Sequence, residues 1–144
     1  MALEIVIPGG TFPISTHTAH EFPSGLGTPV LNPTIVDRSN DFHVHADWQT
    51  QGGIFALFAP SFQWRAEAIF EQMGVGEFAG GPFVTATAHV QTAANQPYAL
   101  MIVIPGSAVP AGIYRVILKL FLDTGLATTP ACGFEDLGLV QFYN

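Results

Sequence analysis

The sequence predicts an all-β fold, a single-domain antiparallel β-sandwich of about eight strands. Three observations predict it. Apolar and polar residues alternate with a period of two in several runs, helical periodicity is hard to find, and Gly or Pro turn signals separate the runs at fairly regular intervals. A length of 144 residues suits one domain, so residues 1–144 are expected to share one core.

Four runs show the alternation most clearly. In residues 42–49, Phe, Val, Ala and Trp occupy one face while His, His, Asp and Gln occupy the other. Residues 64–71, 84–90 and 114–123 alternate in the same way, and the last run places Tyr, Val and three Leu on one face. One apolar and one mixed face per strand is typical of an antiparallel sheet that covers a core.

The remaining strands are expected over four apolar runs bounded by turn residues: 3–7, 30–37, 99–104 and 137–143. Residues 62–73 could compete as a helix, but their alternation and their bounds, Pro60 and Gly74, favour a strand.

Two segments lie between the expected strands. Residues 9–29 show no clear strand pattern and are expected to form a long loop or arm, and loops of that length are usually functional or disordered. The apolar run 53–62 holds three phenylalanines and is expected to be a core-covering connection or a short strand.

The segment Pro110-Ala111-Gly112-Ile113-Tyr114-Arg115-Val116 resembles the start of strand F in an immunoglobulin-like sandwich. There, a corner tyrosine hydrogen-bonds its hydroxyl group back to the preceding loop. The resemblance implies that Trp48 or Trp64 is the core tryptophan of an adjoining strand. It covers roughly the last ~100 residues, a typical length for that fold, and it concerns the fold alone. The disulfide pair of antibody domains is absent, since Cys132 is the single cysteine.

This topology would pair the strand that begins at Trp64 with the strand at 114–123. Glu67 and Glu71 would then face Arg115 and Lys119 across the sheet. Such cross-strand pairs of opposite charge are each worth about 0.2–1 kcal/mol.

The composition excludes several classes of protein. Only 10% of the residues are charged, against roughly 25% in an ordinary soluble domain, so the chain is not a disordered one. Four basic residues and a net charge of −7 do not build the basic surface of a nucleic-acid binder. The uncharged stretch 78–114 contains Pro105-Gly106 and Pro110-Ala111-Gly112, which would break a spanning helix, so no membrane span is expected.

The compartment is predicted from two features. A single cysteine cannot form an internal disulfide, and the residues after Met1 lack the basic and long apolar regions of a signal peptide. An acidic, soluble protein in the cytoplasm is therefore expected.

The histidines form the one titratable cluster. His43, His45 and Asp47 fall on one strand face at i, i+2 and i+4, a spacing that lets two imidazoles converge on zinc or another divalent metal. A third histidine ligand would come from a loop or from another strand, and the candidates are His17, His20 and His89. The alternative is that these side chains lie on the polar, solvent-facing or partner-facing side of a strand, in which case no cofactor is bound.

Nothing in the sequence supports catalysis by a nucleophile. Cys132 lacks the local motif of a cysteine hydrolase, and no Gly-x-Ser-x-Gly elbow, phosphate-binding loop or zinc-protease motif occurs. We therefore expect a protein that is not an enzyme.

The apolar excess predicts contact with a protein partner or with a second copy. The expected interaction surface combines aromatic residues of the long loop, of the apolar run and of the last strand: Phe12, Phe22, Phe55, Phe58, Phe142 and Tyr143. The last strand carries no Lys or Pro to discourage edge pairing, so pairing with the N-terminal strand or burial against a partner is expected.

The predicted function is therefore protein–protein interaction or self-assembly as a homo-oligomer. The alternatives are a metal-binding sandwich that uses the histidine cluster, and a carbohydrate-binding module that uses exposed Trp or Tyr rings.

Overall fold

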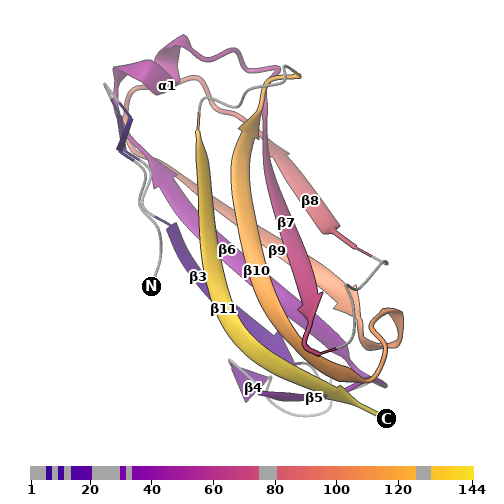
Figure 1. The fold of residues 1–144 in the computed structure, drawn as a ribbon. Coiled ribbons are helices and arrows are strands. Elements are labelled where there is room, and N and C mark those ends of the chain that lie inside the picture. Colours follow the sequence, from indigo (N-terminus) through magenta and orange to yellow (C-terminus); the bar gives the residue numbers. More distant parts are fainter. Residues whose placement is uncertain are drawn as a thin grey trace.

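The computed structural model describes residues 6–7, 10–11, 14–20, 30–31, 34–74, 81–125 and 131–144, with side chains described from residue 34 onward (Figure 1). These residues form an all-β protein with one five-residue helix, α1 (Gly53–Leu57), and one 3₁₀ turn, η2 (Gly106–Ala108). Within the described ranges, no helix has the length and apolar character needed to cross a membrane.

The strands form two larger sheets and one small one. The five-stranded sheet has the order β5 (Ile35–Asp37), β11 (Cys132–Tyr143), β10 (Gly112–Asp123), β7 (Gln63–Gln72), β8 (Phe83–Ala88). The four-stranded sheet has the order β4 (Val30–Leu31), β3 (Ile14–His20), β6 (Asp41–Thr50), β9 (Gln96–Pro105). The small sheet pairs β1 (Val6–Ile7) with β2 (Gly10–Thr11).

One strand pair departs from the expected antiparallel arrangement. β5 runs parallel to β11, with Val36 opposite Phe142, so the five-stranded sheet is mixed. This pairing supplies hydrogen-bond partners to the end of β11, which we had expected to pair with the N-terminal strand. In the described part of that strand, β1 pairs with β2 instead.

The structure differs from the loop expected over 9–29 and from the single strand expected over 30–37. The expected loop contains β2 and β3, and the run 30–37 is divided between two sheets. β3 has the sequence Ile-Ser-Thr-His-Thr-Ala-His, which lacks the apolar alternation of a core strand. The sequence therefore does not predict this strand, which is recognised in the structure by its pairing with β6. The run contains Pro33, and a proline has no N–H group for a sheet hydrogen bond, so a continuous strand over 30–37 is disfavoured.

The apolar run 53–62 begins as helix α1 rather than as a strand. The helix stops at Phe58, whose backbone is extended, two residues before Pro60. A proline disfavours the helical conformation of the residue before it, so the run cannot continue as a longer helix.

Side chains of both larger sheets meet in one core. In β6 and β7 every second residue is buried, and Trp48 of β6 lies 5.7 Å from Trp64 of β7 between ring centroids. Phe42 likewise contacts Phe70 at 6.2 Å and Phe142 at 5.5 Å, in both cases edge to face. These contacts join β6 of the four-stranded sheet to β7 and β11 of the five-stranded sheet. Figure 1 shows the strands of the two sheets overlying one another.

The predicted tyrosine hydrogen bond is present at the start of β10. The buried Tyr114 hydroxyl group donates to the Pro110 carbonyl oxygen at 2.9 Å. Desolvation raises the pKa of Tyr114, and the nearby Arg38 guanidinium partly opposes that shift. Trp64 lies beside this strand, opposite Leu122, and is fully buried.

Replacing Tyr114 by phenylalanine is expected to lower the free energy of unfolding by about 1 kcal/mol at neutral pH, because one intramolecular hydrogen bond is lost. The native pKa is raised, so the unfolded state releases its proton first, near pH ~10. The native protein therefore loses stability as the pH rises above that value, and Tyr114→Phe should reduce this loss. Urea unfolding at pH 7 and pH 10.5 measures both effects. The exposed Tyr143→Phe is the matched control, and an equal response of both variants would contradict the prediction.

Candidate functional site

The outer side of the five-stranded sheet carries an unusual number of exposed apolar side chains. We call it the five-strand face. The register aligns Ile35, Gln141 and Ile113 across β5, β11 and β10, and Leu139 lies opposite Arg115 in the next row. The exposed large apolar residues of this face come from four strands: Ile35, Val84, Ile113, Phe134, Leu139 and Tyr143.

Charged side chains are interspersed among these apolar ones. Arg65 forms an ion pair with Asp123 at 3.4 Å, and Arg115 forms one with Asp136 at 3.5 Å. The Lys119 ammonium lies 4.6 Å from the ring centroid of Phe121, within the range of a cation–π contact.

The predicted cross-strand alignment of charges is confirmed. Glu71 is the partner of Arg115, and Glu67 is the partner of Lys119. The five-strand face thus carries three of the four basic residues of the chain and five of its eleven acidic residues. The rest of the chain carries six acidic residues and one basic residue, so the face has the more balanced mixture of charges.

A β-bulge in β11 decides which residues reach this face. Between the pairs Ile117–Asp136 and Arg115–Leu139, β11 has two residues where β10 has one. Gly138 occupies the bulge with a φ of +89°, which favours glycine, and its N–H donates to the Asp136 carboxylate at 2.9 Å. The extra residue inverts the alternation, so that Leu139 points outward and Phe142 points into the core.

The six residues predicted for an interaction surface are therefore distributed differently. Phe55 and Phe142 are buried in the core, and Phe58 packs partly buried against it. Tyr143 is exposed, whereas Phe12 and Phe22 lie outside the described residues. Sequence reasoning missed Ile113 and Leu139, and the exposure of Leu139 depends on the bulge.

The free thiol of Cys132 belongs to the same face. Cys132 is half-buried and lies opposite Phe121. Desolvation raises its pKa, with a smaller upward contribution from Glu67 and an opposing one from Lys119. A raised pKa lowers the thiolate fraction, which is the nucleophilic form of a cysteine.

The histidines predicted as metal ligands occupy two regions. His43 and His45 lie on the outer side of the four-stranded sheet, with ring centroids 6.0 Å apart, and the exposed Asp47 follows on the same side. The register places His17 opposite His45, whereas His20 is opposite the core residue Phe42. Among side chains that the structure describes, no three His, Cys, Asp or Glu residues form a group that could hold a metal ion.

His89 lies in the core, although the sequence favoured a position on the sheet surface. It is 2% exposed, and its Nδ1 accepts a hydrogen bond from the Trp64 indole N–H at 3.2 Å. An indole only donates, so Nε2 carries the ring proton and donates to the Phe55 carbonyl oxygen at 2.8 Å. Both ring nitrogens are thus used to hold α1 against β7, and His89 stands apart from the other histidines.

Both tryptophans are buried as well, and Trp48 stacks on Tyr98 with ring centroids 5.1 Å apart. Neither indole is therefore open to stack on a sugar, whereas the Tyr143 ring is exposed.

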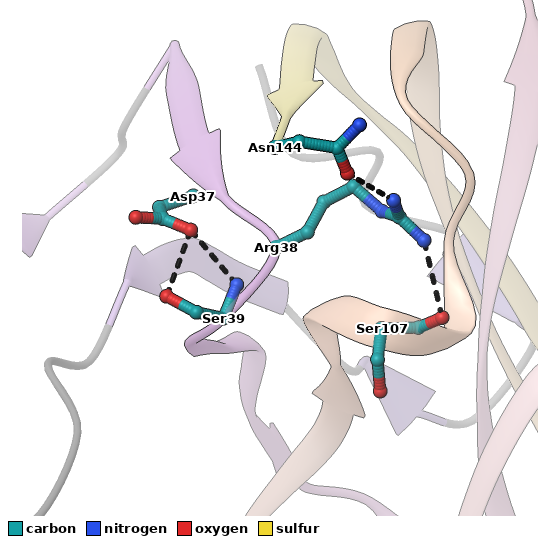
Figure 2. A pocket seen from close by; sticks show the side chains of 5 residues that line it. All are labelled: Asp37, Arg38, Ser39, Ser107 and Asn144. Carbon is teal, nitrogen blue, oxygen red and sulfur yellow. Dashed lines mark hydrogen bonds between the residues drawn. The ribbon is translucent and has the colours of Figure 1, made fainter.

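Figure 2 shows an open hollow between the β5–β6 turn, η2 and the last residue, lined by Asp37, Arg38, Ser39, Ser107 and Asn144. The Arg38 guanidinium donates to the carbonyl oxygens of Val109 (2.6 Å) and Ser107 (3.4 Å) and to the Asn144 side chain. The Asp37 carboxylate accepts from the N–H and the hydroxyl group of Ser39. These groups satisfy one another, so the hollow serves to connect three chain segments rather than to bind a ligand.

A scan of the chain against protein-family models finds no match, and searches of the curated proteins and of the solved structures find none either.

Proposed function

We propose that this protein is a non-enzymatic module that associates with a second copy of itself through the five-strand face. The observation that carries the proposal is the composition of this face. Its exposed apolar residues lie among charges of both signs, on a protein that is otherwise strongly acidic. Exposed apolar side chains gathered on one face together with charged ones are typical of a protein–protein contact.

The charge distribution favours a copy of the chain as the partner. Outside this face, the described acidic residues are Asp41, Asp47 and Glu135, and the one basic residue is Arg38, so other contacts offer fewer pairs of opposite charge. The five-strand face instead presents Arg65 and Arg115 beside Asp123 and Asp136. In a two-fold dimer the same surface is used twice, so a mixture of both signs can be complementary to itself.

The proposal includes an immunoglobulin-like fold. In that fold strands C, F and G lie in one sheet and strands B and E in the other, with a core tryptophan on strand C and a corner tyrosine on strand F. The adjacent strands β7, β10 and β11, the pair β6–β9, buried Trp64 and the Tyr114 hydrogen bond support this assignment. An experimental structure that lacked this strand order would overturn it.

Light scattering and sedimentation over a concentration series test self-association. The mass of the wild type is expected to rise to that of a dimer, and Leu139→Glu should lower the dimer affinity at least tenfold, because a charge would be buried in the interface. Leu139 is 48% exposed in the monomer, so its fold should tolerate the change. Leu57→Glu, at a residue of α1 that is 77% exposed, is the matched control and should dimerise normally.

A milder variant and a thiol probe locate the contact. Ile113→Thr keeps a β-branched residue in β10 and should weaken the dimer without affecting the strand. Alkylation of Cys132, measured at one alkaline pH throughout, should become slower as the protein concentration rises and the dimer forms. A monomeric wild type at high micromolar concentration, or dimers indifferent to both Leu139→Glu and Ile113→Thr, would refute the proposal.

A further inference from the structure

The outer side of the four-stranded sheet brings two histidines and a methionine into one row. His45 of β6 has His17 of β3 as its partner on one side and Met101 of β9 on the other. In the adjacent row, His43 lies between Ala19 and Val103. The three strands are far apart in sequence, so this row exists only in the folded protein.

The spacing of these residues suits a single small ion. The Cβ atoms of directly opposite residues in a sheet are about 4.5–5.5 Å apart, and successive outward residues of one strand lie about 6.6–6.8 Å apart. The His43 and His45 rings have centroids 6.0 Å apart. With metal–imidazole bonds of about 2 Å, one ion fits between rings at that separation.

The ligand types identify the metal. Zinc sites in proteins are built from Cys, His, Asp and Glu, whereas a thioether is a soft ligand that selects monovalent copper. Met101 is 46% exposed, so its sulfur can be reached from solvent. Asp47 is exposed and two residues further along β6, where its Cα partners are Ser15 and Ala99.

We propose that His43, His45 and Met101 form a site for Cu(I) on the outer side of the four-stranded sheet, where His43 is 5% exposed and Met101 is open to solvent. The imidazole nitrogens and the thioether sulfur are neutral donors, and the ion binds to them without loss of a proton from a thiol. The site uses the opposite side of the molecule from the five-strand face, and it does not depend on dimerisation.

Competition with a chromogenic Cu(I) chelator under anaerobic, reducing conditions tests the site. All proteins should carry Cys132→Ser, because a free thiol also binds Cu(I). The chain is expected to take one Cu(I), and Met101→Leu, which keeps the side-chain volume, should weaken binding at least tenfold. Met73→Leu is the matched control: Met73 is 45% exposed and lies beyond the end of β7, so affinity should be unchanged.

A second measurement separates the thioether from the imidazoles. His45→Ala should weaken both Cu(I) and Zn²⁺ binding, whereas Met101→Leu should weaken Cu(I) binding alone. Circular dichroism confirms that each variant is folded. Absence of Cu(I) binding, or equal affinities of the Met101→Leu and Met73→Leu proteins, would overturn the proposal.

Discussion

Replacing His89 by phenylalanine is expected to lower the free energy of unfolding by at least about 2 kcal/mol. The substitution fills the site with an aromatic ring but removes the acceptor of the Trp64 indole N–H and the donor to the Phe55 carbonyl oxygen. Each buried polar group left unsatisfied costs about 1–3 kcal/mol. The loss of the second bond should also loosen α1, because His89 Nε2 holds its backbone.

Urea unfolding of four proteins measures this effect: the wild type, His89→Phe, Trp64→Phe and the double variant. The double variant lacks both the indole donor and the imidazole acceptor, so its destabilisation should be smaller than the sum of the two single changes by about 0.5–3 kcal/mol. His45→Phe, the same substitution on the outer side of β6, should have a much smaller effect. Additive single changes would show that the hydrogen bond contributes little.

The sequence predicts the core strands well, because their signal is local. The alternation in β6, β7 and β10 reports which residues are buried, and burial of every second residue in these strands agrees with it. The alignment of Glu67 with Lys119 was also predictable, since the strand resemblance implied which pair of strands is adjacent. The adjacency of β7 and β10, together with the period of two in each strand, places Glu67, Glu71, Arg115 and Lys119 on the same face.

The exposed face and the histidine row depend on information that is not local. The bulge at Gly138 inverts the alternation within β11. The sequence alone does not show whether a glycine in a strand forms a bulge, so this inversion could not be predicted. Met101 meets His45 through the register of β6 with β9, two strands separated in the sequence by more than forty residues. His89 lies just beyond the end of β8, where the alternation no longer indicates burial.

Replacing Gly106 by alanine is expected to destabilise the protein by about 3 kcal/mol or more. A Cβ atom at this position would lie 2.3 Å from the Asn40 carbonyl oxygen and 2.7 Å from that of Arg38. Both obstacles are backbone atoms of the turn between β5 and β6, so no side-chain rotation relieves the clash. The Gly106 N–H also donates to the Asn40 carbonyl oxygen at 3.1 Å, a bond that the displaced turn would lose. Overpacking alone costs about 1–3 kcal/mol, and the lost bond adds to it.

Thermal unfolding of Gly106→Ala beside Gly53→Ala separates this clash from the general cost of losing a glycine. Gly53 lies in α1 with no atom within 4 Å of a Cβ there, so its replacement should raise stability by up to about 1 kcal/mol through helix propensity. At roughly 2–4 °C per kcal/mol, Gly106→Ala should lower Tm by about 6–12 °C, while Gly53→Ala leaves Tm equal or higher. A small shift for Gly106→Ala would mean that the Arg38–Asn40 turn moves away from η2 at little cost. The hydrogen bonds from Arg38 to Ser107 and Val109 would then contribute little to holding the two segments together.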